Sequence, residues 1–451
     1  MEPFHFHLFV CAQQKPEGVD SCPVRGSFAV LDRLDHEIQA RGLGRDVQVT
    51  TCGCMGLCEQ GPVMVVYPQG VWYRRVQSSD ISEIVGTHLC NGKLVDRLIW
   101  NDATAMNAMA VEHTDNFRAV MAARDMAGTL PDHLDQMIRN YMPSRCLLTA
   151  LELDIFTAVA DGGDAEQISR RIHANARAVA MLLNALVALR LLSKSGDVYS
   201  NTPESARFFV QGSKDDHRNG LLHIANIWHR WSTLTEAVCR GTSIPIDRDK
   251  TPEWTRSFIA GMQRNAKDRA PHVVAALGAG GVRRILDLGG GSGAYSIAFA
   301  KACPGVHCEI VDLPEVVPLT AEYVSKAGVK AQVTVRAGDM LRADFGSGYD
   351  IVLLNAICHM FSEEQNRDIF RRARLALVPK GRLVVQDFIL NPDKTGPQHA
   401  ALFSLNMLVS TAAGASYSEA EYACWMKAAG FPEVRRINLP GPSDLIVGLA
   451  Q

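Results

Sequence analysis

Short apolar runs alternate with segments of helical periodicity from residue 283 to the end of the chain. Such alternation favours a parallel sheet that is covered by helices on both faces. The last two apolar runs flank Pro440, Gly441 and Pro442, which predicts a terminal antiparallel hairpin. The expected strands are residues 285–288, 308–311, 333–337, 351–354, 383–388, 434–438 and 444–449.

A glycine-rich loop, residues 287–293, follows the first expected strand and leads into a helix. Glycine lets the backbone turn sharply and approach a ligand closely at a helix N-terminus. Asp312 ends the next strand roughly 20 residues later, where a carboxylate can bind the hydroxyls of a ribose. The loop alone also satisfies a dinucleotide pattern. The segment 338–340 after the third strand and the terminal hairpin favour S-adenosylmethionine instead.

Together these segments resemble the class I O-methyltransferases that carry an N-terminal dimerisation domain. The resemblance covers about residues 141–451 and includes the segments 150–156, 286–293, 311–314 and 338–340. It implies a Rossmann-like methyltransferase domain over residues 246–451 that binds S-adenosylmethionine. The expected cofactor-binding residues are Asp287, Gly289, Gly291, Gly293, Asp312, Leu313, Gly338, Asp339, Met340 and Asn355.

His359 follows the fourth expected strand, at the edge where parallel sheets place their chemistry. A histidine with an ordinary pKa of about 6.5 can accept the proton of a phenol, which activates the oxygen toward a sulfonium methyl group. Plant small-molecule O-methyltransferases have a similar Ile-Cys-His segment, and by that resemblance His359 is the catalytic base. Asp387 matches one carboxylate that the family places beside this histidine. Ser416 stands where a second is expected, and Met360-Phe361 replace the usual Asp-Trp.

The methyl acceptor is expected to bind beside helices that lie before the glycine loop and near the C-terminus. Trp254, Phe258 and Met262 recur at helical spacing on one face of the first segment. Asn406 and Met407 lie on the second segment, which often covers the substrate in the resembling family.

Residues 131–245 show the period of helices, and residues 101–130 are expected to form a linker helix. Within the helical region, two helices precede a small hairpin at residues 191–199, which is the winged-helix arrangement. In the resembling family this domain pairs subunits through an apolar surface. We therefore expect a homodimer.

Six of the 12 cysteines lie in the first 90 residues. We see no secretory leader and no apolar run of roughly 18 residues, so we expect a cytoplasmic protein that does not enter a membrane. Persistent disulfides are rare in that compartment, and clustered cysteines there indicate metal or redox chemistry. The other cysteines are expected to be small buried hydrophobes. They are Cys146, Cys239, Cys303, Cys308, Cys358 and Cys424.

Two cysteine pairs stand out, because ten residues separate Cys11 from Cys22 and three separate Cys54 from Cys58. Four thiolates suit either an iron–sulfur cluster or a structural zinc ion. The segments around these pairs resemble the thioredoxin-like 2Fe–2S ferredoxins over nearly all of residues 4–99. The resemblance implies a ferredoxin domain over residues 1–100 in which the four cysteines bind a 2Fe–2S cluster, with Cys52 as a spare thiol.

The net charge of −2 argues against a nucleic-acid binder that works by bulk charge. The leading hypothesis is methyl transfer from S-adenosylmethionine to a hydroxyl of a small aromatic or tetrapyrrole-like molecule. The ferredoxin domain would deliver or sense electrons, or dock a redox partner protein. One alternative is a hydroxylase-like redox enzyme that uses S-adenosylmethionine as a structural ligand, and another is a redox-sensing regulatory protein. Methyl transfer is redox-neutral, so the leading hypothesis leaves the ferredoxin domain without a role in the reaction itself.

Overall fold

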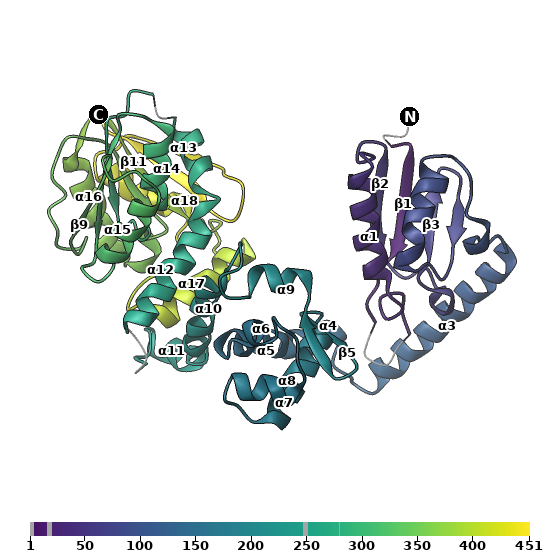
Figure 1. Ribbon diagram of the computed structural model, residues 1–451. Helices are drawn as coiled ribbons and strands as arrows, with labels where there is room; N and C mark the ends of the chain where they lie inside the picture. The colour runs from purple at the N-terminus through teal and green to yellow at the C-terminus, as the bar shows by residue number, and fades with distance from the viewer. Residues whose placement is uncertain (1–3, 16–19, 247–250, 279) are drawn as a thin grey trace. The chain divides into compact units, whose positions relative to one another are not determined.

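The computed structural model describes residues 4–15, 20–246, 251–278 and 280–451. The chain divides into two compact units, Met1–Asn140 and Tyr141–Gln451, and each is described by itself (Figure 1). None of the described helices combines the length and the apolarity that crossing a membrane requires.

The N-terminal unit contains a four-stranded sheet in the order β2-β1-β3-β4. Strand β1 is parallel to β2 and antiparallel to β3, which forms a hairpin with β4. The elements are β1 (Phe6–Cys11), α1 (Ser27–Ala40), β2 (Val47–Cys52), η1 (Cys58–Gln60), β3 (Met64–Tyr67), β4 (Val71–Tyr73), η2 (Ser78–Asp80), α2 (Ile81–Ile84), η3 (Val85–Leu89), η4 (Asp96–Leu98), α3 (Ala103–Met126) and α4 (Asp132–Arg139).

The expected linker helix is α3, and its first half packs on the N-terminal unit. The Asp102 side chain accepts a hydrogen bond from the backbone N–H of Ala105 at 2.9 Å and so caps the helix. A small apolar cluster then joins α3 to the loop after β2. Its buried members are Leu57, Val63 and Trp100, with Met55, Trp72, Ala105, Met106, Met109 and Ala110 packed against them.

The C-terminal unit begins with a helical region that contains one small hairpin. Strands β5 and β6 pair antiparallel directly after two helices, which confirms the helix-helix-hairpin order expected from the sequence. Asp164 and Asn175 cap these two helices through their side-chain oxygens. The elements are α5 (Tyr141–Glu152), α6 (Ile155–Ala158), α7 (Ala165–Arg171), α8 (Ala176–Ala188), β5 (Leu192–Ser195), β6 (Val198–Asn201), α9 (Pro203–Phe208), α10 (Arg218–Trp231) and α11 (Leu234–Arg240).

The rest of this unit is built on a seven-stranded sheet in the order β12-β13-β11-β10-β7-β8-β9. Five strands are parallel, while β13 is antiparallel to both β11 and β12, so the expected terminal hairpin is confirmed. The elements are α12 (Pro252–Lys267), α13 (Ala270–Leu277), β7 (Arg284–Leu288), α14 (Ala294–Ala302), β8 (His307–Asp312), α15 (Val317–Lys326), β9 (Val333–Ala337), β10 (Tyr349–Asn355), η5 (Cys358–Met360), α16 (Glu363–Ala376), β11 (Leu377–Asp387), α17 (Gln398–Ser410), α18 (Glu419–Ala428), β12 (Glu433–Ile437) and β13 (Asp444–Leu449).

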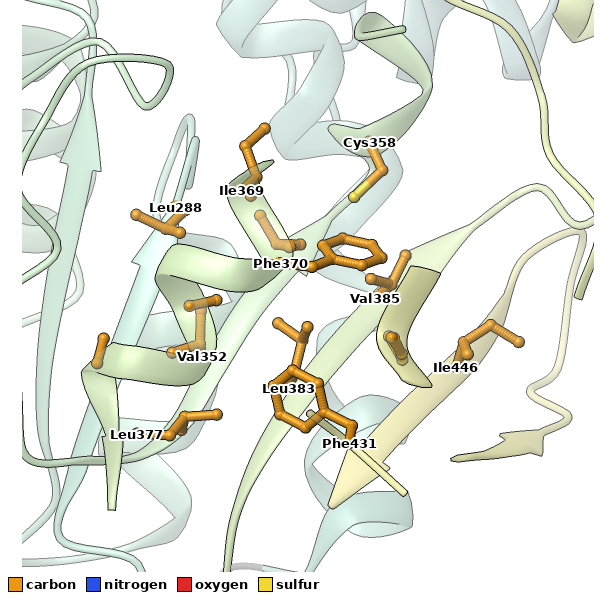
Figure 2. Close-up of a cluster of buried hydrophobic side chains, with 14 of the residues drawn as sticks. Leu288, Val352, Cys358, Ile369, Phe370, Leu377, Leu383, Val385, Phe431 and Ile446 are labelled. Carbon is orange, nitrogen blue, oxygen red and sulfur yellow. The ribbon is translucent and has the colours of Figure 1, made fainter. Parts of the chain in front are cut away.

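Helices cover both faces of this sheet. Successive residues of a strand point to opposite faces, so the apolar residues of one strand contribute to two cores. Val352 of β10 packs with Phe370 of α16 in one core, which Figure 2 shows, and Leu354 belongs to the same core. Ile351 and Leu353 of the same strand pack with α13 and α14 in the other core. The alternation of strands and helices in the sequence therefore predicted the layers correctly.

The cysteines outside the N-terminal unit fall into three groups. Cys146 and Cys303 are only partly buried. Cys308 and Cys358 are 2% and 0% exposed, so they are the small buried hydrophobes that we expected. The expectation is wrong for Cys239 and Cys424, which are exposed. They lie on α11 and α18, and each of these helices leaves part of its surface in solvent.

Candidate active site

The carboxyl ends of the five parallel strands meet at one edge of the large sheet. Most residues that the sequence predicted for cofactor binding and catalysis lie at or just beyond these ends. The strand-end residues are Leu288 of β7, Asp312 of β8, Ala337 of β9, Asn355 of β10 and Asp387 of β11. Ligands of parallel α/β sheets bind at this edge.

The glycine loop between β7 and α14 is packed too tightly for larger residues. Gly289 has a φ of +66°, and a Cβ there would lie 2.9 Å from Ile357 Cγ1. Gly293 has a φ of +76°, and its Cβ would lie 2.9 Å from Ile310 Cδ1. Glycine alone satisfies both the left-handed backbone and the close approach.

Asp312 connects the glycine loop to the end of β8. Its carboxylate accepts hydrogen bonds from the backbone N–H groups of Gly291 and Leu313, both at 2.7 Å. Burial raises the pKa of Asp312, and these two hydrogen bonds act in the opposite direction. The Asp312 carbonyl also accepts the N–H of Gly338 at 2.8 Å, which brings the 338–340 segment to the same edge.

Buried polar atoms without a partner cluster on the cofactor side of the site. Asp287 is 0% exposed, and burial raises its pKa to about 6. Ser296 donates to one of its oxygens at 2.7 Å, while the other has no partner among the described residues. Both atoms of the Asn355 amide, which is 8% exposed, also lack a partner within the described part of the chain. Buried polar groups are normally hydrogen-bonded, so this edge is suited to a polar ligand.

The remaining predicted cofactor residues frame this edge. Asp339 Oδ1 accepts the backbone N–H of Leu341 at 2.9 Å, and Met340 is 6% exposed. Leu313, by contrast, is 41% exposed and presents an apolar side chain to solvent. An apolar side chain of this kind can cover an aromatic ring such as adenine.

His359 and Asp387 form a hydrogen-bonded pair at the ends of β10 and β11. His359 Nδ1 lies 2.7 Å from Asp387 Oδ1, and their side chains are only 6% and 1% exposed. The backbone N–H of His359 also donates to Asp387 Oδ2 at 3.2 Å. A carboxylate only accepts, so in the neutral imidazole Nδ1 carries the proton and Nε2 carries the lone pair.

The Nε2 atom of His359 is left available for chemistry. Within the described residues it forms no hydrogen bond, and it is not among the fully buried unpaired atoms. The ring of Phe403 packs edge-on against the imidazole at a centroid distance of 4.7 Å. This arrangement holds the ring in place and leaves one nitrogen able to accept a proton.

Two side chains that support this pair were missed in the sequence analysis. Tyr422 donates a hydrogen bond to Asp387 Oδ2 at 2.8 Å, and burial raises its pKa well above the usual value, so the phenol stays protonated. Phe403 fixes the face of the His359 ring. Neither lies in a motif, and their role depends on contacts between distant parts of the chain.

Ser416 and Gly414 lie on a segment that packs behind His359. A Cβ on Gly414 would overlap the carbonyl oxygen of His359, so only glycine fits there. Ser416 is 2% exposed, and its hydroxyl oxygen has no partner among the described residues.

The five residues predicted for the acceptor pocket lie on α12 and α17. The rings of Trp254 and Phe258 stack at a centroid distance of 5.4 Å, and Met262 is half-buried on the same helix. Asn406 accepts a hydrogen bond from Trp231 Nε1 at 2.9 Å, and Met407 is 5% exposed.

Of these two helices, α17 contacts the histidine within the described part of the chain. Its Phe403 touches the His359 ring, whereas among the described residues no ring contact or hydrogen bond links Trp254, Phe258 or Met262 to His359. The acceptor role of the α12 residues therefore stays a prediction.

The four predicted cysteine ligands lie together in the N-terminal unit. Cys54 Sγ lies 3.4 Å from Cys58 Sγ, and the neighbouring thiols of Cys22 and Cys54 raise the pKa of the Cys11 thiol. A Cβ on Gly61 would lie 2.8 Å from Cys22 Sγ, so glycine makes room for that thiol. This donor set fits the four thiolates that an iron–sulfur cluster needs.

Comparison with known proteins connects these features to a family. Residues 236–432 match the O-methyltransferase domain, and residues 135–211 match the O-methyltransferase dimerisation domain. Neither match includes residues 1–134.

Individual relatives agree with the family matches. The chain is 33% identical to 3-hydroxy-5-methyl-1-naphthoate 3-O-methyltransferase of Streptomyces sahachiroi, over 73% of this chain and 99% of that protein. It is 30% identical to the S-adenosyl-L-methionine-dependent methyl transferase PigF of Serratia sp., over 72% and 97% of the two chains. The solved structure of PigF with SAH superposes with a TM-score of 0.66 and 28% identity, over 71% of this chain and all of that one.

A seven-stranded sheet with a parallel core, a terminal antiparallel hairpin and a glycine loop at its carboxyl edge defines the class I methyltransferase fold. The chain belongs to the O-methyltransferase family whose members carry a dimerisation domain, and it is an S-adenosylmethionine-dependent O-methyltransferase.

Proposed function

We propose that this methyltransferase acts on a hydroxyl group of a small aromatic or tetrapyrrole-like molecule, with His359 as the general base. The hydrogen bond between His359 Nδ1 and Asp387 Oδ1, at 2.7 Å, carries the proposal because it leaves Nε2 free to accept a proton. The Streptomyces sahachiroi relative is named as a methyltransferase for a hydroxyl on an aromatic naphthoate, which supports the substrate class.

His359 would take the proton from the acceptor hydroxyl, and Asp387 would stabilise the imidazolium that forms. Tyr422 and the backbone N–H groups of His359 and Phe388 hold that carboxylate in position. Such a base contributes about 10²–10⁴ in rate, and alignment of the reactants supplies much of the rest.

The cofactor would be held by the residues at the carboxyl edge of the sheet. The glycine loop gives close backbone approach, Asp312 offers a carboxylate for ribose hydroxyls, and Asn355 offers an unpaired amide. Gly338, Asp339, Met340 and Leu313 would surround the adenine. When bound, S-adenosylmethionine supplies an electrophilic methyl group.

The proposal is tested by product stoichiometry with aromatic hydroxyl acceptors. We expect S-adenosylhomocysteine and methylated product in a ratio of one to one. An oxidised product formed while S-adenosylmethionine is not consumed would support the hydroxylase alternative and contradict methyl transfer.

We also propose that the N-terminal unit is a thioredoxin-like domain that binds a 2Fe–2S cluster through Cys11, Cys22, Cys54 and Cys58. The contact between the Cys54 and Cys58 thiols, the raised pKa of Cys11 beside Cys22 and Cys54, and the space left by Gly61 support this assignment. When bound, the cluster supplies one-electron transfer, which suits redox sensing or docking of a redox partner protein.

Metal analysis tests the cluster. We expect two irons and two acid-labile sulfides per chain and a visible absorption that Cys54→Ser removes or shifts. A colourless wild type that contains only zinc would contradict it.

A homodimer is the assembly we propose for the full chain. The matched dimerisation segment carries exposed apolar side chains such as Met181, which is 60% exposed, and Met142, which is 44% exposed. Light scattering should give twice the mass of 49.3 kDa, and a monomer at micromolar concentration would contradict the proposal.

A further inference from the structure

The side chain of His113 lies near the thiols of Cys54 and Cys58, and no cysteine motif predicts this histidine. It lies on α3 and follows Ala105, Met106, Met109 and Ala110 on the helix face that packs against the loop after β2. A Cβ on Gly56 of that loop would lie 2.9 Å from Ala110 Cα. The helix is therefore in close contact with the loop that carries Cys54 and Cys58.

The donor atoms of Cys54, Cys58 and His113 form a compact triangle. His113 Nε2 lies 3.6 Å from Cys54 Sγ and 3.8 Å from Cys58 Sγ, and the two sulfurs are 3.4 Å apart. Bonds of about 2.3 Å to sulfur and about 2.0–2.1 Å to nitrogen, at tetrahedral angles, place neighbouring ligand atoms about 3.5–3.8 Å apart. The triangle thus has nearly the edges of one face of a tetrahedral metal site.

Lys15 shows which way the imidazole lone pair points. Its ammonium nitrogen lies 2.6 Å from His113 Nε2 and 3.1 Å from Cys58 Sγ. An ammonium group only donates, so Nε2 presents a lone pair to this cation. Two of the three donors, His113 and Cys58, thus already face one positive charge in the way that ligands face a metal ion.

We propose that Cys54, Cys58 and His113 hold a single zinc-like divalent cation in chains that lack the cluster. Their three donor atoms all lie within 4.8 Å of one another. Two thiolates and one imidazole leave the fourth tetrahedral position of a zinc ion open to a water molecule. The site shares two thiols with the proposed cluster, so the two metal forms exclude each other.

Cobalt(II) titration of the metal-free, full-length chain tests this site. We expect one cobalt per chain, with the visible bands of tetrahedral thiolate coordination, and displacement by zinc. His113→Ala should weaken cobalt binding at least about tenfold and change the bands. The exposed His133, on α4, offers a matched control, because His133→Ala should bind like the wild type. Equal affinity and equal bands for His113→Ala and the wild type would overturn the proposal.

Cys22→Ser separates this proposal from the cluster assignment. Cys22 is outside the tetrahedral set, so the variant should bind cobalt like the wild type but fail to assemble two irons and two sulfides. His113→Ala should assemble two irons and two sulfides but bind cobalt weakly. Loss of cobalt binding in Cys22→Ser would contradict the mononuclear site, while a wild type that never takes up iron and sulfide would contradict only the cluster.

Discussion

In the C-terminal unit, Asp387 accepts hydrogen bonds from His359, from Tyr422 and from the backbone of Phe388. In the N-terminal unit, Cys54 Sγ lies 3.4 Å from Cys58 Sγ and 3.6 Å from His113 Nε2. The catalytic base is thus oriented by a carboxylate, whereas the thiols lie against other groups that can bind a metal ion. A hydrogen-bonded base is already oriented for proton transfer. Adjacent thiols, by contrast, bind a metal ion when they release their protons. The following changes test this contrast.

Asp387→Asn should have the largest effect. The amide cannot supply the negative charge that stabilises a protonated His359, and it no longer fixes the proton on Nδ1. We expect kcat for methyl transfer to fall about 10²- to 10⁴-fold. Glu433→Gln, at an exposed carboxylate on β12, is the matched control. A wild-type kcat in Asp387→Asn would show that the pair does not act in catalysis.

Asp287 should make the free energy of unfolding depend on pH. Its folded pKa of about 6 lies above the unfolded value, so the folded state binds more protons between about pH 4 and pH 6. The free energy of unfolding should therefore fall as the pH rises through that window. Asp287→Asn should remove this fall and raise stability at pH 7 by roughly 3 kcal/mol. Denaturant unfolding of the cofactor-free proteins at a series of pH values measures this difference. Parallel pH profiles of the free energy of unfolding for the wild type and Asp287→Asn would contradict the prediction.

Gly56→Ala should have a smaller effect, confined to the N-terminal unit. Gly56 has a φ of +78°, and its Cβ would collide with Ala110 of α3. Gly70→Ala is the control, because Gly70 has a φ of +67° with no atom within 4 Å of its Cβ. The backbone strain alone costs about 1–2 kcal/mol. We expect faster hydrogen exchange of the α3 amides in Gly56→Ala than in Gly70→Ala, and equal rates would contradict the packing of α3 on this loop.

Removal of metal from the N-terminal unit should have the smallest effect. Methyl transfer is redox-neutral, and the groups that move the proton belong to the C-terminal unit. Chelation should therefore leave the initial rate of S-adenosylhomocysteine formation unchanged. A rate that falls with the loss of iron and recovers on reconstitution would show that the two sites are coupled.

Local sequence patterns predicted much of the fold and indicated the residues that we propose for cofactor binding. The glycine loop and Asp312 could be found because each follows an apolar strand, and parallel strands bring their carboxyl ends to one edge. The four cysteines were found through their spacing and a family resemblance. Tyr422 and His113 could not be found in this way. Tyr422 is 35 residues from Asp387, and His113 is 55 residues from Cys58, so only tertiary packing brings them to their sites.

The most direct test of the central claim is the turnover of His359→Ala. The account predicts that kcat for S-adenosylhomocysteine formation falls about 10²- to 10⁴-fold while the Kd for S-adenosylmethionine stays at the wild-type value. Unchanged turnover, at saturating cofactor and acceptor, would contradict the assignment of His359 as the base.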